Sequence, residues 1–292
     1  FINAKRFSPE VSVGEITICD CGYKTSNTPP PLDEFRPFVS GSEWGTGFDS
    51  HAWFHFEFDI PQEMRTKPVQ LALKSGIKGW DGDNPQFIAY INGELRQGLD
   101  TNHTFVLLGE ETHCDVYIYG YTSPRIKTTR FYAALRNVNY NTEQLYYDIL
   151  VPLEMLDYLD EYSKEYFEIV RHLDNAVDLL DLYDVGSEQF FASVDRALAY
   201  MSEKATGNKN RALAYMREEF YGKYCSSEEI GNSVTTVGIG HTHIDCAWKW
   251  TLQQTREKVQ RSFGTVLELM KQYPEYKFMS SQALLYKYLK EE

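Results

Sequence analysis

The sequence contains little cysteine and little positive charge, and it has no apolar run of membrane-spanning length. Among its 292 residues there are five Cys, and 29 Lys and Arg stand against 42 Asp and Glu, which gives a formal net charge of −13. Nucleic acids and anionic membranes are bound by clustered Lys and Arg, so neither is an expected partner. Because about 20 consecutive apolar residues are needed to cross a bilayer, no membrane-spanning segment is expected.

Cysteine spacing and motif content exclude further classes of protein. Cys19 and Cys21 are too close in an extended segment to form a bridge, and no CxxC pair indicates a structural zinc site. The opening segment, FINAKRFSPE, lacks the apolar core of a signal peptide. The sequence also has no GxGxxG, P-loop or HExxH motif. We therefore expect a protein of a reducing compartment, the cytoplasm.

Aromatic residues, by contrast, make up 15% of the chain, and short strand patterns fill residues 1–148. In HAWFHFEFDIP, residues 51–61, apolar residues alternate with polar ones until Pro61 ends the run. The Asn92-Gly93 pair in QFIAYINGELRQG is a strong hairpin signal. Further strand patterns are VQLALKSG, CDVYIYGY and TTRFYAALRNV. We predict an antiparallel β-sandwich, jelly-roll-like, over residues 1–148.

The apolar period changes near Pro152, from the spacing of strands to that of helices. Residues 152–184 carry apolar residues at steps of three, four and seven with an acidic opposite face, as in an amphipathic helix. Two more helices are predicted, over 188–204 and, after a break at Gly207-Asn208, over 210–224. We assign residues 149–230 to a helical connector without chemistry of its own.

Residues 231–292 read as the beginning of an α/β domain. The order of patterns is a buried strand in SVTTVGIG, a helix over 252–273, a second strand in YKFMSSQ and a helix in ALLYKYLKEE. A parallel sheet of two strands cannot bury both of its faces, so we expect the domain to continue downstream. The predicted fold class is thus multidomain α+β, with the catalytic α/β domain barrel-like and truncated.

His241, His243 and Asp245 follow directly after the apolar run VTTVGIG. Ligands of α/β folds bind at the carboxyl ends of strands, and residues two apart in an extended segment share a face. Imidazole and carboxylate are ordinary Zn²⁺ ligands, so the segment can offer donors to one ion. Polar residues of a surface loop could have the same sequence pattern. Moreover, the ligands of one segment alone do not complete a zinc site.

The motif and the sequence after it resemble a known family. GHTHIDCAWKWTLQQTREKVQRSFGTVLELMKQYPEYKFMSSQALLY is similar to the start of the catalytic domain of zinc-dependent retaining α-mannosidases, glycoside hydrolase family thirty-eight. Its Gly-His-x-His-x-Asp-x-x-Trp opening, the following helix with an Arg and the Tyr-Pro-Glu turn carry the resemblance. Upstream, WGTGFDSHAWFHFEFDIP and FIAYINGEL more weakly resemble the amino-terminal β-domain of cytosolic-type members.

The resemblance implies a role for each matching residue. His243 and Asp245 would be zinc ligands, while His241 and Arg256 would lie near the metal without binding it. Trp248 would stack on a mannose face, although core packing is the alternative for it and is favoured for the neighbouring Trp250.

The implied reaction is the removal of terminal α-linked mannose from oligosaccharides, with Zn²⁺ as cofactor and retention of configuration. Such enzymes act by double displacement with a carboxylate nucleophile and a carboxylic acid. The resemblance places both groups beyond Glu292, so we assign no catalytic residue within this chain and expect the chain alone to be inactive. The resemblance implies mannose-containing oligosaccharides as partners and leaves homo-oligomer formation open.

Two alternatives remain. A metal-dependent amidohydrolase also carries His-x-His at the end of a first barrel strand; His241 and His243 would then both bind metal, and Asp245 would be secondary. The chain could instead be a non-catalytic carbohydrate-binding or structural module, with Trp44 or Trp80 as a sugar platform. For that module, the alternative role of Trp44 and Trp53 is to fill the sandwich core, which we favour.

Overall fold

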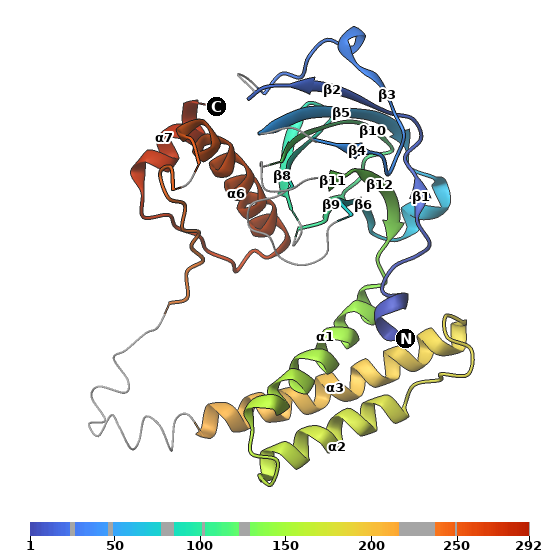
Figure 1. The fold of residues 1–292 in the computed structure, drawn as a ribbon. Coiled ribbons are helices and arrows are strands. Elements are labelled where there is room, and N and C mark those ends of the chain that lie inside the picture. The colour runs from blue at the N-terminus through green and yellow to red at the C-terminus, as the bar shows by residue number, and fades with distance from the viewer. Residues whose placement is uncertain are drawn as a thin grey trace. The chain divides into compact units, whose positions relative to one another are not determined.

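The computed structural model describes residues 1–23, 27–45, 49–76, 85–100, 103–122, 129–215, 237–248 and 250–291. The chain divides into two compact units, which Figure 1 colours along the sequence. One unit consists of Phe1–Ser8 and Val138–Val237, and the other of Pro9–Asn137 and Gly238–Glu292. In the part of the chain that is described, no helix is both long and apolar enough to cross a membrane.

Antiparallel sheets occupy residues 9–137 (Figure 1). The six-stranded sheet has the order β3 (Arg36–Phe38), β2 (Ile16–Cys21), β5 (Ser50–Asp59), β10 (His113–Thr122), β7 (Gln86–Ile91) and β8 (Glu94–Leu99). The four-stranded sheet has the order β1 (Val11–Ser12), β12 (Tyr132–Asn137), β6 (Val69–Lys74) and β9 (Phe105–Leu108). A third, two-stranded sheet pairs β11 (Thr129–Arg130) with β4 (Glu43–Trp44). Short 3₁₀ helices are η2 (Leu32–Glu34) and η3 (Gln62–Thr66).

The alternation predicted for residues 51–61 is confirmed in β5. Phe54, Phe56 and Phe58 point into an apolar core that both large sheets share. Phe54 stacks on Phe131 from the segment before β12, with ring centroids 3.9 Å apart. The intervening residues lie on the outer face of the six-stranded sheet, where Trp53 packs against aromatic neighbours. The predicted hairpin is also confirmed: Asn92 and its following glycine have φ of 53° and 80°, as a two-residue primed turn requires.

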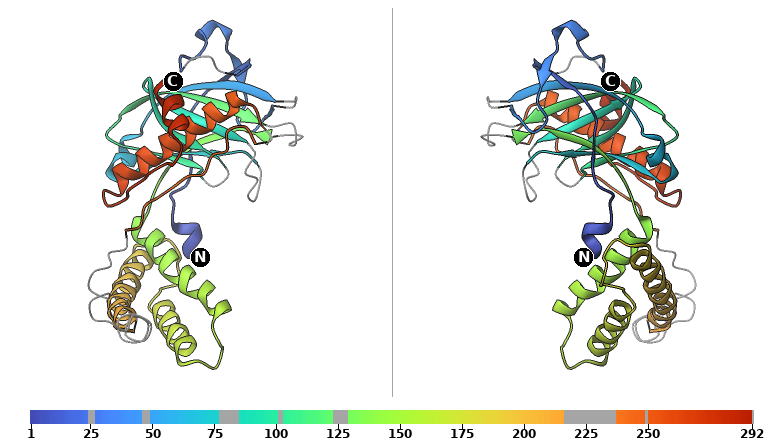
Figure 2. Two further views of the ribbon diagram at one scale, coloured as in Figure 1. Left: turned by 90° about the vertical axis from the view of Figure 1, so that its left-hand side faces the viewer. Right: turned by 90° about the vertical axis from the view of Figure 1, so that its right-hand side faces the viewer.

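Part of the outer face of the six-stranded sheet is covered by helix α6 (Leu252–Gln272), which contacts β7 and β8 (Figure 2). The approach is close because Gly98 has no side chain: a β-carbon there would lie 2.6 Å from the carbonyl oxygen of Arg261. The Thr265 hydroxyl donates to the Gly98 carbonyl at 3.1 Å. Helix α7 (Ala283–Glu291) packs against α6.

The helical unit differs from the prediction. Its elements are η1 (Ile2–Lys5), α1 (Tyr140–Met155), η4 (Leu156–Tyr158), α2 (Lys164–Asp178) and α3 (Glu188–Tyr215). A single helix over 152–184 is wrong, because Ser163 caps a new helix by accepting a hydrogen bond from the Tyr166 N–H at 3.2 Å. The predicted break at Gly207-Asn208 is also wrong, since α3 continues to Tyr215. The remainder of the third predicted helix, 216–224, lies outside the described residues.

In residues 238–291 the expected parallel pairing is present as a single bridge between Gly240 and Phe278. The Gly240 N–H donates to Lys277 O at 2.7 Å, and Met279 N–H donates to Gly240 O at 3.0 Å.

Residues 233–236 of the first predicted strand lie outside the described residues. In the described remainder Val237 and Ile239 are exposed, at 66% and 49%, so the prediction of a buried strand is wrong there. The described residues contain no barrel. The coarse fold class is confirmed as mixed α+β, antiparallel sheets followed by helices. The jelly-roll description and the domain boundaries stay predictions.

Candidate metal site

His243 and Asp245 lie side by side at the end of the segment that begins with Gly240. The His243 Nε2 atom is 3.0 Å from Asp245 Oδ1, and both side chains are exposed. Ile244 between them is buried in a small core with Phe263 of α6 and Leu285 of α7. The alternation expected of an extended segment therefore places the two donors outward on one side.

His241 is held differently from these two residues. Its Nε2 atom lies 3.4 Å from the Ser281 hydroxyl, in the segment that pairs with Gly240. The sequence predicted that three side chains would project together; the structure pairs His243 with Asp245 and His241 with Ser281.

Thr255 fixes the turn between Asp245 and α6. Its buried hydroxyl accepts hydrogen bonds from Ala247 N–H at 3.2 Å and from Trp250 Nε1–H at 2.9 Å. Ala247 has φ of 68°, a left-handed conformation that costs free energy in a residue with a β-carbon. The hydrogen bonds to Thr255 hold the backbone at Ala247 in this conformation. His243 and Asp245, which precede Ala247, therefore lead into a turn of defined conformation.

The two tryptophans of the motif occupy different environments. Trp248 is 59% exposed, and its ring meets that of Trp250 edge-on with centroids 6.1 Å apart. Trp250 is half-buried, with the Lys258 ammonium 4.5 Å from its ring centre. Trp248, whose ring is exposed, is the residue that the motif matches to sugar stacking. Trp250 instead packs against Trp248 and Lys258.

Arg256 joins α6 to α7. Its Nη1 atom lies 2.9 Å from Glu291 Oε2, and its guanidinium lies 4.2 Å from the ring centre of Tyr288. These contacts give Arg256 a packing function; its expected place near a metal stays a prediction.

A cavity of about 350 Å³ lies beside His243. Its lining combines His243 and Trp250 with Lys258 of α6 and with Asp100 and His103 from the segment between β8 and β9. Asp100 Oδ1 accepts from the His103 backbone N–H at 2.8 Å and lies 3.1 Å from its Nδ1. The hydrogen bond between the two side chains raises the pKa of His103, whereas burial lowers it. Sequence reasoning missed both residues because they belong to no motif.

A buried polar network fastens α6 to the sheet. The Tyr119 hydroxyl donates to Glu257 Oε1 at 2.8 Å, and His51 Nδ1 lies 2.7 Å from the same hydroxyl oxygen. Arg261 donates to Gln86 of β7. Burial lowers the pKa of His51, although the nearby Asp49 carboxylate raises it. Likewise, burial lowers the pKa of Arg261 and the Glu257 carboxylate raises it.

Trp44 and Trp53 are buried, at 4% and 2% exposure, so Trp44 is not a sugar platform. Trp44 fills the shared core, as predicted, whereas the same prediction for Trp53 is wrong because Trp53 packs on the outer face of the sheet. Trp80 lies outside the described residues. Cys19, Cys21, Cys114 and Cys246 are free thiols.

The His243–Asp245 pair fits a zinc ion in chemistry and in spacing. Imidazole nitrogen and carboxylate oxygen bind Zn²⁺ at about 2.0–2.2 Å, so two donors of a tetrahedral ion lie roughly 3.3–3.6 Å apart. The observed separation of 3.0 Å is that of a hydrogen bond and is somewhat shorter. Two donors fill half of a tetrahedral shell.

Comparison with known proteins relates the chain to glycosidases. Residues 233–292 match the family described as "Glycosyl hydrolases family 38 N-terminal domain". Alpha-mannosidase G of Dictyostelium discoideum is 24% identical over 283 residues, 88% of this chain and 23% of that protein. Alpha-mannosidase 2C1 of Homo sapiens is 24% identical over 271 residues, 86% of this chain and 23% of that protein. An alpha-mannosidase of Saccharomyces cerevisiae is 49% identical over 55 residues, 19% of this chain and 5% of that protein.

The chain therefore spans about a quarter of the length of the relatives that match most of it. The region of family similarity contains the His243–Asp245 pair and both helices packed behind it. Over most of its length the chain is a distant relative of α-mannosidases, and its carboxyl-terminal part matches the family 38 N-terminal domain.

Proposed function

We propose that the chain is the amino-terminal part of a zinc-dependent, retaining exo-α-mannosidase that acts on mannose-containing oligosaccharides. The observation that carries this proposal is the outward-facing His243–Asp245 pair, 3.0 Å apart, within the region that matches family 38. Exposed Trp248 three residues later supports it.

Each side chain has a distinct part in this proposal. His243 Nε2 and the Asp245 carboxylate would hold the ion, and Thr255 would keep their turn in place. Trp248 would present its ring to the apolar C–H face of a mannose. When bound, a zinc ion would act as a Lewis acid that binds neighbouring hydroxyls of the mannose and favours distortion of its ring toward the oxocarbenium-like transition state.

The proposed reaction is a double displacement, in which one carboxylate attacks the anomeric carbon and a second group protonates the leaving oxygen. Neither role is assigned to a residue of this chain. We propose that residues 231–292 begin a barrel-like catalytic domain, which follows a β-sandwich domain (1–148) and a helical connector (149–230) along the sequence. The proposed role of this chain is to bind the zinc ion and to orient the sugar.

The test uses the longest natural protein that contains this chain. Zinc content and hydrolysis of an aryl α-mannoside are measured for the wild type, Asp245→Asn and His241→Ala, with Asp59→Asn as a control for loss of an exposed carboxylate. We expect Asp245→Asn to hold one zinc ion fewer than wild type and to lose activity, His241→Ala to hold as much zinc as wild type, and the control to match wild type. An enzyme of the amidohydrolase type would lose zinc with His241→Ala instead. Full activity after exhaustive chelation would contradict both.

A further inference from the structure

We propose that His55, Glu57 and Asp115 form a second divalent-metal site, on the outer face of the six-stranded sheet, and that its ion is Zn²⁺. One ligand atom from each of the three residues lies within 4.8 Å of the other two. His55 Nε2 is 3.0 Å from Asp115 Oδ1 and 3.6 Å from Glu57 Oε1. This proposal is independent of the mannosidase proposal.

Strand register brings the three side chains together. In the antiparallel pair of β5 and β10, Glu57 lies opposite Asp115 and His55 lies opposite Tyr117. Residues 55 and 57 share the outward face, because the residues on either side of them point into the core. Directly opposed residues of antiparallel strands have β-carbons about 4.5–5.5 Å apart, which is within reach of one ion.

The charges of this group favour a cation. Glu57 and Asp115 are like charges directly opposite each other, an arrangement that destabilises a sheet. Within the described part of the chain, the ion-pair partner of both carboxylates is the same His55 imidazole, which is charged only when protonated. A divalent ion would compensate both negative charges at once.

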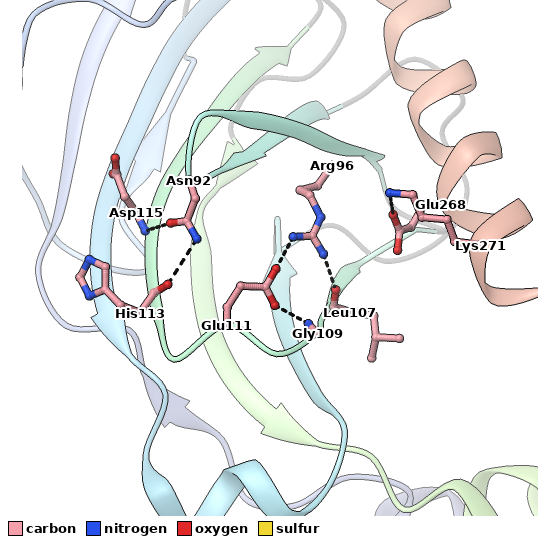
Figure 3. A network of polar contacts seen from close by, with 9 residues as sticks. All are labelled: Asn92, Arg96, Leu107, Gly109, Glu111, His113, Asp115, Glu268 and Lys271. Carbon is pink, nitrogen blue, oxygen red and sulfur yellow. Dashed lines mark hydrogen bonds and ion pairs between the residues drawn. The ribbon is translucent and has the colours of Figure 1, made fainter.

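The His55 ring and the backbone that carries Asp115 are held in place before any ion binds, whereas the Glu57 side chain is exposed. The His55 side chain is 11% exposed, and its ring stacks on Tyr117 with centroids 4.4 Å apart and packs edge-on against Phe35. The Asn92 side chain forms hydrogen bonds to the backbone of β10 at Asp115 and at His113 (Figure 3): its Oδ1 accepts from Asp115 N–H at 2.9 Å, and its Nδ2 donates to the His113 carbonyl at 3.4 Å. Ordered donors lose little conformational entropy on binding.

One imidazole and two carboxylates are a donor set for zinc. Zn²⁺ accepts nitrogen and oxygen ligands in a four-coordinate shell, and water can supply the fourth position. Ca²⁺ requires six to eight oxygens, and Mg²⁺ binds few protein ligands and keeps its waters. The set therefore predicts zinc binding with selectivity against Ca²⁺ and Mg²⁺.

The same two strands provide a matched control. His113 Nδ1 lies 2.9 Å from Asp59 Oδ1 across the pair, and both side chains are exposed. This pair has the same imidazole–carboxylate contact but belongs to no three-donor group among the described residues. It would be a simple ion pair on the sheet surface.

The experiment is a calorimetric titration of the 292-residue chain with ZnCl₂, with CaCl₂ in parallel, and circular dichroism confirms that each variant is folded. Every protein in the titration, the reference included, also carries His243→Ala, so that the His243–Asp245 pair cannot contribute zinc binding. We expect the reference protein to bind zinc and not calcium, and His55→Gln and Asp115→Asn each to weaken zinc binding by at least ~10-fold, the loss seen when even an outer partner of a ligand is removed. In that background His113→Gln and Asp59→Asn should leave zinc binding unchanged. Absence of zinc binding in the reference protein would overturn the proposal, as would binding that survives Asp115→Asn or is lost with His113→Gln.

Discussion

Gly98 sets the distance between the sheet and α6, and replacing it by alanine should separate them. A β-carbon at Gly98 would lie 2.6 Å from the Arg261 carbonyl oxygen and 2.7 Å from its Cα, whereas ordinary contacts begin near 3.4 Å. Both atoms belong to helix backbone, so relief requires α6 to move. A displacement of this kind also strains the hydrogen bond from Thr265 to the Gly98 carbonyl.

The magnitude follows from two opposing effects. Overpacking of this kind costs about 1–3 kcal/mol, and exchange of a strand glycine for alanine returns roughly 0.5–1 kcal/mol through backbone entropy. We expect a net destabilisation of about 1–2 kcal/mol, with the loss concentrated in the docking of α6.

Gly264 on α6 is the matched control. A β-carbon there would lie 2.8 Å from Leu95 Cδ2, the tip of a flexible side chain that can turn away. Since alanine favours a helix over glycine by about 0.8–1.0 kcal/mol, Gly264→Ala should be neutral or stabilising.

The assay is hydrogen–deuterium exchange of the 292-residue chain with urea unfolding alongside. We expect Gly98→Ala to speed exchange of the α6 amides while strand β5 stays protected, and Gly264→Ala to leave both unchanged. If α6 stayed equally protected in Gly98→Ala, or if both variants lost the same protection, Gly98 would not set the distance between the sheet and α6.

Three further results are expected. Tyr119→Phe removes a donor from buried Glu257 and should lower the free energy of unfolding by about 1–3 kcal/mol in urea titrations, and a change below 0.5 kcal/mol would contradict this. Because burial lowers the pKa of His51, the unfolded chain takes up a proton that the folded chain does not. Stability present above about pH 6.5 should therefore fall on acidification, by at most about 1.4 kcal/mol per pH unit, and this dependence should be absent in His51→Gln. Asp100→Asn should lower the pKa of His103 in an NMR titration, since the hydrogen bond to Asp100 raises it.

Strand structure was predictable wherever the pattern is local. Alternation in β5 and the Asn92-Gly93 turn were read correctly because each is set by neighbours within a few residues. The helical unit was harder: an apolar period of 3.6 continues across a chain reversal, and Ser163 as a cap is one polar residue among many. Gly207 reads as a break, yet α3 continues through it.

The candidate site shows the same division. His243 and Asp245 are two residues apart, so alternation alone predicts that they meet, whereas the partner of His241 depends on a pairing with Ser281 forty residues later. His55 and Glu57 were visible as the polar face of β5, but their meeting with Asp115 depends on the register of β10. Register between distant strands is not contained in the pattern of either strand.

The most direct test of zinc binding by His243 and Asp245 is diffraction from crystals of the longest natural protein containing this chain, measured on both sides of the zinc absorption edge. We expect an anomalous peak within bonding distance of His243 Nε2 and of an Asp245 carboxylate oxygen. A zinc-loaded, active enzyme in which neither side chain touches the ion would contradict this expectation.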